Sequence, residues 1–189
     1  RDRFEVCNHR YTALCDTSHG AAVLNDCKYG ISVEGNEMAL TLLRAAASPQ
    51  MRADNGSHVF TYSFYAWEGG FADCDVIRQG YELNSGLKLT RGSAGSCSLL
   101  DISRKNIILE TVKPAEDGSG DLILRFYEAA GAAVETDICF HAEIEKLWKC
   151  NMLEEKGKEL KQKEGRIRLN FGMFEIKTIR MHIKSFFCR

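Results

Sequence analysis

The chain has 189 residues, a formal net charge of −1, 44% hydrophobic residues and 27% charged residues, which are ordinary values for a globular protein. The near-neutral charge, with neither half basic or acidic, argues against a nucleic-acid or anionic-membrane partner. No apolar run approaches the roughly 20 residues that a membrane span needs.

The N-terminus is charged, has no signal-peptide core and does not begin with Met, so we expect a fragment of a longer, cytoplasmic polypeptide. The eight cysteines are irregularly spaced. A chain this long needs no disulfide framework, so we expect reduced thiols.

The first part of the chain predicts short strands. Its apolar runs are separated by Gly, Asn, Asp and Ser turn signals every roughly 8 to 12 residues, a spacing typical of sandwiches and barrels. The runs are residues 11–15, 21–24, 29–33 and 38–43. A Pro and an Asn-Gly pair then predict a long loop over residues 45–56.

Residues 58–66 are expected to form the longest strand. Because apolar and aromatic residues alternate onto both of its faces, we expect a central strand covered twice. Residues 71–81 carry apolar residues at helical spacing with acidic residues near their start, which predicts one short helix. Residues 84–95 are polar and glycine-rich, and indicate a surface excursion.

A hairpin is the strongest local prediction. Two apolar runs, residues 107–112 and 122–127, flank a segment with a Pro and two X-Gly pairs. Pro presets φ and Gly supplies positive φ, so the middle predicts a turn. Leu122, Leu124 and Phe126 should share one face of the second strand.

The remaining chain predicts further strands at residues 133–144, 146–153, 166–171 and 173–183, with a bulge near Thr178. The charge run over residues 154–165 indicates a solvated edge or connection. The pattern predicts an all-β chain: one domain over residues 1–189, an antiparallel β-sandwich of about a dozen strands with one short helix.

Sequence motifs for chemistry are weak. Cys7, His9, Cys15 and His19 lack the tight paired spacing of structural zinc ligands. Several carboxylates are available, but nothing in the sequence brings a pair to the separation that a glycosidase needs. No nucleophile-elbow or phosphate-loop pattern occurs. We therefore expect no catalytic residue and no metal ligand in this chain.

One loop is a better candidate for a binding site. Asp54, Asn55 and His58 crowd hydrogen-bonding groups at the start of the aromatic strand. Beside Tyr62 and Trp67, they could meet a sugar, which offers hydroxyl groups and an apolar ring face. The alternative, a loop whose polar side chains cap its own backbone, stays open.

Eight strings in chain order carry a family resemblance. They are FEVxxHRY at 4–11, VLNDCKYG at 23–30, LLRA at 42–45, ADNGSHVFTY at 53–62, VIRQGYELN at 76–84, ETVKPAEDGSGDL at 110–122, RFYEA at 125–129 and FEIKT at 174–178. Together they resemble the C-terminal β-sandwich region of class II α-mannosidases, glycoside hydrolase family 38, in its cytosolic and bacterial branch.

The resemblance implies a retaining exo-α-mannosidase whose Asp nucleophile and zinc belong to an N-terminal catalytic domain. No stretch here matches those motifs, so the fragment alone should be inactive and should hold no cofactor. The implied partners are that catalytic domain and an α-mannoside, and a homo-oligomer stays open. The polar residues expected nearest the sugar pocket are, in the first place, Asp54, Asn55 and His58, and in the second place Asp26 and Lys28.

The family pattern is not followed throughout. Residues 85–100 and 132–146 diverge, residues 182–189 form an unusual tail, and Gly172-Met173-Phe174 stands where a proline is expected before the phenylalanine. Two other functions are possible alternatives to a mannosidase domain. They are an autonomous carbohydrate-binding module and a purely structural interaction domain.

Overall fold

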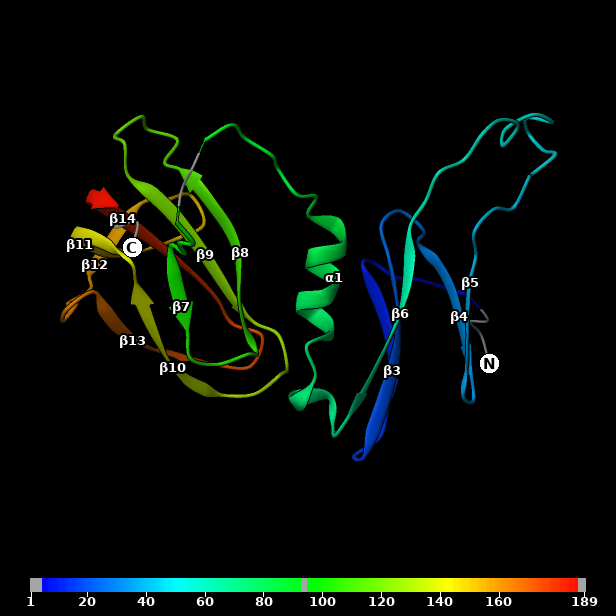
Figure 1. Cartoon of the computed structure of the whole chain (residues 1–189), viewed down its shortest axis with the longest axis horizontal. Coiled ribbons are helices and arrows are strands. Elements are labelled where there is room, and N and C mark those ends of the chain that lie inside the picture. The colour runs from blue at the N-terminus through cyan, green and yellow to red at the C-terminus, as the bar shows by residue number, and fades with distance from the viewer. Residues whose placement is uncertain (1–4, 93–94, 187–189) are drawn as a thin grey trace. The chain divides into compact units, whose positions relative to one another are not determined.

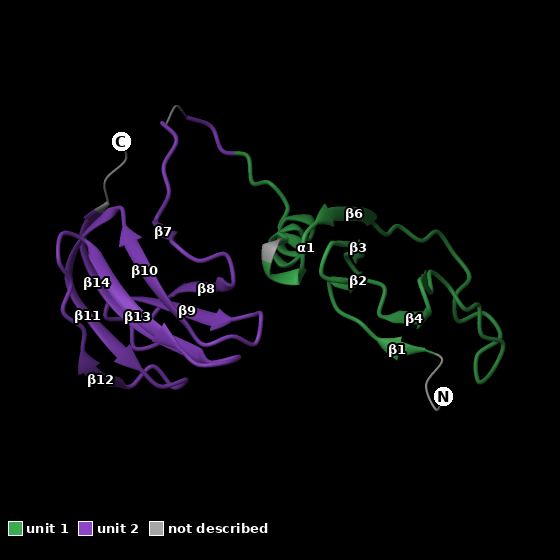
Figure 2. Ribbon diagram, turned by 90° about the horizontal axis from the view of Figure 1, so that it is seen from below, with its two compact units in different colours: residues 1–89 green, residues 90–189 purple. Residues whose placement is uncertain are grey.

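The computed structural model describes residues 5–92 and 95–186. The chain forms two compact units, residues 1–89 and 90–189 (Figure 2), and each is described by itself. The described residues contain fourteen strands and one α-helix, and every strand pairing is antiparallel. The all-β prediction is therefore confirmed, whereas one domain over residues 1–189 stays a prediction.

Within the described ranges, no helix has both the length and the apolar character needed to cross a membrane. The seven cysteines that the structure describes are not joined to one another by disulfide bonds.

Unit 1 consists of two three-stranded sheets, one helical turn and one helix (Figure 1). The sheet orders are β1-β4-β5 and β2-β3-β6. The elements are β1 Val6–Cys7, β2 Tyr11–Cys15, β3 His19–Asn25, β4 Gly30–Glu34, β5 Glu37–Leu40, β6 Tyr62–Glu68, the 3₁₀ turn Phe71–Asp73 and α1 Val76–Asn84.

The helix α1 lies along one face of the β2-β3-β6 sheet, as Figure 1 shows. The predicted helix over residues 71–81 thus becomes a 3₁₀ turn and a helix displaced toward the C-terminus. Val76 is fully buried against Ala22 and Leu24 of β3. Gly80 is also buried, and a Cβ there would lie 3.4 Å from the Tyr11 ring. A small residue at this point lets the helix approach the sheet closely.

The prediction for β6 is wrong in two respects. The strand covers Tyr62–Glu68 only, and β14 is the longest strand. β6 is also an edge strand, and its residues alternate between exposed and half-buried. The alternation of residues predicts a strand, but it does not show whether the strand lies at the edge of its sheet or which of its faces is covered.

Unit 2 is a sandwich of a five-stranded sheet, β12-β11-β14-β9-β8, and a three-stranded sheet, β13-β10-β7. The strands are β7 Leu100–Ile102, β8 Ile107–Pro114, β9 Leu122–Glu128, β10 Val134–Phe140, β11 Ala142–Cys150, β12 Lys156–Glu159, β13 Arg166–Phe171 and β14 Ile176–Phe186.

One hydrophobic core lies between the two sheets of unit 2. The five-stranded sheet contributes Leu124, Phe126 and Met181, all 0% exposed. The three-stranded sheet contributes Ile138 and Phe171 among others. Alternate residues of each strand supply these side chains, as the two-residue repeat of a strand requires.

The predicted hairpin is confirmed as β8 and β9, with Val112 opposite Leu124. The charge run is also confirmed as an exposed edge, because all four residues of β12 are exposed and the strand lies at the border of its sheet. The prediction of a bulge near Thr178 is wrong. The pairing of β14 with β11 shifts register on both sides of Ile183, between Ser185 and Ile183 and between Ile183 and His182. The β14–β9 register continues evenly through Thr178, which pairs with Arg125.

Candidate functional site

Two of the predicted site residues, Asp26 and Lys28, lie in the turn between β3 and β4. The Asp26 N–H donates to the Thr61 carbonyl at 3.1 Å, and the Asp26 carboxylate accepts the Thr61 N–H at 2.9 Å. The Lys28 ammonium lies 4.5 Å from the centre of the Phe60 ring. The Cys27 thiol and the Thr61 N–H donate to the Asp26 carboxylate and hold its pKa below the usual range. The turn is thereby fixed to the segment that enters β6.

Three asparagines, of which Asn8 and Asn25 are buried, hold the backbone of the same turn by hydrogen bonds. The Asn25 side chain, 2% exposed, accepts the Lys28 N–H at 2.8 Å and donates to the Asn8 side-chain oxygen at 2.8 Å. The Asn8 amide donates to the Lys28 carbonyl at 3.3 Å, and the Asn84 amide to the Asn25 carbonyl at 3.1 Å. Such satisfied buried polar groups favour one conformation. Sequence reasoning read Asn25 only as a turn residue and missed this network.

The other predicted residues, Asp54, Asn55 and His58, lie in the loop before β6. A ring nitrogen of His58 lies 2.8 Å from the Asp54 carbonyl, and the Asn55 N–H donates to the Arg52 carbonyl at 3.2 Å. His58 and Asn55 are exposed. These hydrogen bonds stay within the loop, so the self-capping alternative describes part of its geometry.

The two aromatic residues expected beside this loop face different surroundings. Tyr62 is 57% exposed and its ring stacks on Phe60, with 6.4 Å between centroids. Trp67 instead packs against the α1 side of the sheet beside Tyr65. An aromatic surface near Asp26 and Lys28 is therefore made by Phe60 and Tyr62, without Trp67.

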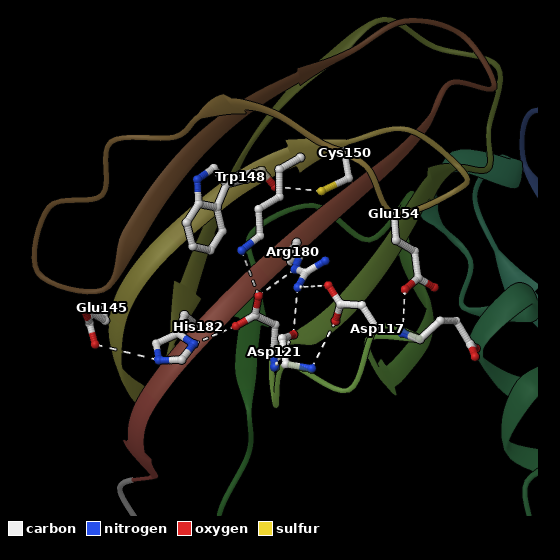
Figure 3. Close-up of polar contacts among 11 residues, drawn as sticks. Asp117, Asp121, Glu145, Trp148, Cys150, Glu154, Arg180 and His182 are labelled. Carbon is white, nitrogen blue, oxygen red and sulfur yellow. Dashed lines mark hydrogen bonds and ion pairs between the residues drawn. The ribbon is translucent and has the colours of Figure 1, made fainter.

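A second polar cluster lies on unit 2, on the outward face of the five-stranded sheet (Figure 3). Arg180 of β14 is 5% exposed, and its Nε lies 2.5 Å from Oδ2 of Asp121. Its Nη2 donates to the Asp117 carboxylate at 2.6 Å and to the Ser119 hydroxyl at 2.7 Å. The turn between β8 and β9 is thereby fastened to β14.

Two more basic side chains contact the Asp121 carboxylate. His182 Nδ1 lies 2.6 Å from its Oδ1, and Lys156 Nζ lies 3.2 Å from its Oδ2 and 4.0 Å from the centre of the Trp148 ring. Burial raises the pKa of Asp121, but hydrogen bonds from His182, Arg180 and Lys156 outweigh it and lower that pKa to about 2. Asp121 is thus an ionised structural anchor and a poor proton acceptor at neutral pH.

A third cluster centres on Glu128, which is 1% exposed at the end of β9. Its carboxylate accepts five hydrogen bonds of 2.8 to 3.1 Å, from the Asn106 amide and the backbone N–H groups of residues 130, 131, 132 and 174. Burial raises its pKa, but these donors outweigh burial and bring the pKa below the usual range. The carboxylate organises two loops, and its oxygens are already occupied by these five donors.

The four residues considered for zinc do not form a metal site. His9 stacks on Tyr29 with 6.0 Å between ring centroids, and His19 approaches Ser18 and Asp16. Among the residues that the structure describes, no group of three or more His, Cys, Asp and Glu side chains could hold a metal ion. The side chains described here therefore do not fit zinc.

Two models of one protein family match the sequence. Residues 1–52 match the glycosyl hydrolases family 38 C-terminal domain, and residues 106–179 match the family 38 C-terminal beta sandwich domain. The two matches are in chain order and together cover about two thirds of the chain.

Curated relatives are similar along nearly the whole chain. Alpha-mannosidase 2C1 of Homo sapiens is 37% identical over 185 residues, which are 94% of this chain and 18% of the relative. Alpha-mannosidase G of Dictyostelium discoideum is 37% identical over 188 residues, which are 94% of this chain and 17% of the relative. The chain thus spans less than a fifth of the length of these relatives.

A solved structure shares the fold. The crystal structure of an alpha-mannosidase from Enterococcus faecalis V583 aligns with a TM-score of 0.73 at 17% identity, over 96% of this chain and 22% of that one. The matched models and the curated relatives agree on one family, the models place the match in its C-terminal region, and the solved structure shares the fold. The chain belongs to glycosyl hydrolase family 38, as part of its C-terminal region.

Proposed function

We propose that the chain is the C-terminal region of an α-mannosidase that removes terminal α-linked mannose from mannosides or oligosaccharides. In this proposal residues 1–189 support and help to shape the active site of an N-terminal catalytic domain. The observation that carries it is the pair of C-terminal family 38 matches in chain order, on a chain less than a fifth as long as its relatives.

Bond cleavage is assigned to the catalytic domain, with retention of configuration and with zinc held there. The described side chains of this chain do not fit a metal ion, so the proposal gives them no part in metal-assisted bond cleavage. Their part is to present hydrogen-bonding groups. The turn with Asp26 and Lys28 suits this role because the buried Asn25 and Asn8 fix its backbone. Asp54, Asn55 and His58 would add further hydrogen-bonding groups from the neighbouring loop.

The test measures kcat/KM of the full-length parent with an aryl α-mannoside. Asp26→Ala and Lys28→Ala should lower kcat/KM about tenfold or more if they help to position the sugar. The matched control is Lys161→Ala, which changes an exposed lysine of unit 2. The 189-residue chain alone should show no turnover. Zinc-dependent hydrolysis by this chain, or full activity of both site variants, would contradict the proposal.

One observation favours a second candidate, an autonomous carbohydrate-binding module. Phe60 and Tyr62 form an aromatic pair beside the polar Asp26–Lys28 turn, and an aromatic face with adjacent polar groups suits a sugar ring. Calorimetry of the chain with mannose or mannobiose should then show saturable binding that Tyr62→Ala removes. Heat at the level of buffer dilution would eliminate this candidate.

A further inference from the structure

The β2-β3-β6 sheet of unit 1 carries apolar side chains on both faces, but α1 covers one face only. Cross-strand pairing places Phe64 beside Val23, and Ala66 beside Ala21 and Leu14, on the side away from α1. We call this side the outer face. Its apolar residues are Leu14, Ala21, Val23, Tyr62, Phe64 and Ala66, and the same pairing places the polar residues Thr12 and Asn25 on it.

The outer face is most exposed along β6. Phe64 is 71% exposed and Tyr62 is 57% exposed. Figures 1 and 2 both place β4 on this side of the sheet, yet the second sheet of unit 1 leaves these two rings open. Adjacent exposed aromatic side chains are typical of a surface that binds another protein segment.

The core of unit 1 is small for its length. Of the buried hydrophobic residues in the described chain, four lie in unit 1 and sixteen in unit 2. Those of unit 1 are Ala22, Leu24, Ile31 and Val76. Two units of similar length with such unequal cores indicate that unit 1 buries further apolar surface against another part of its polypeptide.

We propose that an apolar segment of the parent polypeptide, upstream of this chain, packs on the outer face at Tyr62 and Phe64. The proposal rests on the proposed function, because it requires a longer parent. The matched models are C-terminal, and this chain covers 18% of the human relative and 22% of the Enterococcus faecalis structure. Most of the parent polypeptide, including the segment that covers the outer face, would therefore lie upstream of this chain.

A second copy of the chain suits this face less well. Each large aromatic side chain can bury about 150 to 250 Å², so the two rings offer roughly half of the 800 Å² per partner that a stable interface needs. A covalently linked segment needs no such area, since the linkage supplies a high effective concentration. The open edge of β6 offers the same segment backbone groups for pairing.

The test places the photo-crosslinking residue p-benzoylphenylalanine at position 64 of the full-length parent. The matched control has it at position 87, where Leu87 is 97% exposed and lies outside the sheets. After illumination, mass spectrometry should find position 64 joined to a peptide upstream of this chain, and position 87 not. A crosslink only within residues 1–189, a crosslink to a second copy, or no crosslink would overturn the proposal.

Hydroxyl-radical footprinting of the unmodified parent gives a second measurement that needs no variant. The rate at which a side chain is modified follows its exposed area. Phe64 is 71% exposed in this chain, and if a segment of the parent buries it, its modification should be about fivefold or more slower in the native parent than in the denatured parent. Leu87 should change little. Equal rates for Tyr62 and Phe64 in the native and denatured parent would refute the proposal. Both readouts are independent of mannoside hydrolysis, so an inactive parent with a covered face would count against the proposed function alone.

Discussion

The Arg180 Nε lies 2.5 Å from Oδ2 of Asp121, and the two side chains are 6% and 3% exposed. These residues are 59 positions apart in the chain. The contact joins the turn between β8 and β9 to the middle strand of the five-stranded sheet. A buried ion pair is costly to break because the remaining charge is left desolvated.

Asp121→Asn should therefore lower the free energy of unfolding of the chain by about 3 to 5 kcal/mol. The substitution keeps the size of the side chain and removes the charge that faces Arg180. Urea unfolding followed by circular dichroism measures the change. The matched control is Asp137→Asn, which breaks an exposed pair with Arg168 and should cost at most about 1 kcal/mol. Equal losses for the two variants would mean that burial does not set the strength of the Asp121 pair.

The same carboxylate predicts a pH dependence. The pKa of Asp121 is lowered to about 2 in the folded chain, and its ordinary value is 3.8. A lowered pKa means that the folded state favours the ionised form, so this contribution is complete above about pH 4 and is lost as the pH falls toward about 2. The unfolding free energy of the unsubstituted chain should fall more steeply in that window than that of Asp121→Asn. Parallel curves for the two proteins would contradict the assignment.

The hairpin and the charged edge could be predicted because their signals are local. Pro114, Gly118 and Gly120 indicate a turn, and the run of charges at residues 154–165 indicates contact with water. The polar clusters could not be predicted in this way. Asp121 and Glu128 are residue types that usually lie on surfaces, and their burial depends on partners far along the chain.

The surroundings of the candidate residues could be predicted only in part, for the same reason. The sequence identifies Asp26 as a turn signal, and the family resemblance adds Lys28. The structure brings Asp26 to Thr61 and Lys28 to Phe60. Nothing local distinguishes Asn25 as the buried residue that holds the turn. Whether Asp54, Asn55 and His58 meet a sugar stays a prediction, since their hydrogen bonds run within their own loop.

Glu128→Gln should destabilise unit 2 by about 2 kcal/mol or more. A neutral amide accepts hydrogen bonds more weakly than a carboxylate, and its NH₂ group would face backbone N–H donors instead of an acceptor. Thermal and urea unfolding of the chain measure the loss. Glu159→Gln, on the exposed strand β12, is the control and should change stability by no more than about 0.5 kcal/mol. A Glu128 variant as stable as this control would show that the five hydrogen bonds are dispensable.

Gly20→Ala should destabilise unit 1 by about 1 to 3 kcal/mol through overpacking. A Cβ at Gly20 would lie 2.1 Å from the Trp67 ring and 2.7 Å from the Cβ of Cys15, and the ring is held in the core beneath α1. Gly86→Ala is the matched control, because a Cβ there meets nothing within 4 Å. Native-state hydrogen exchange of β3 and β6 isolates unit 1, and protection should fall in the Gly20 variant while the control keeps it. If both variants keep full protection, Trp67 can move aside and the close packing of β3 against β6 is not what sets the stability of this sheet.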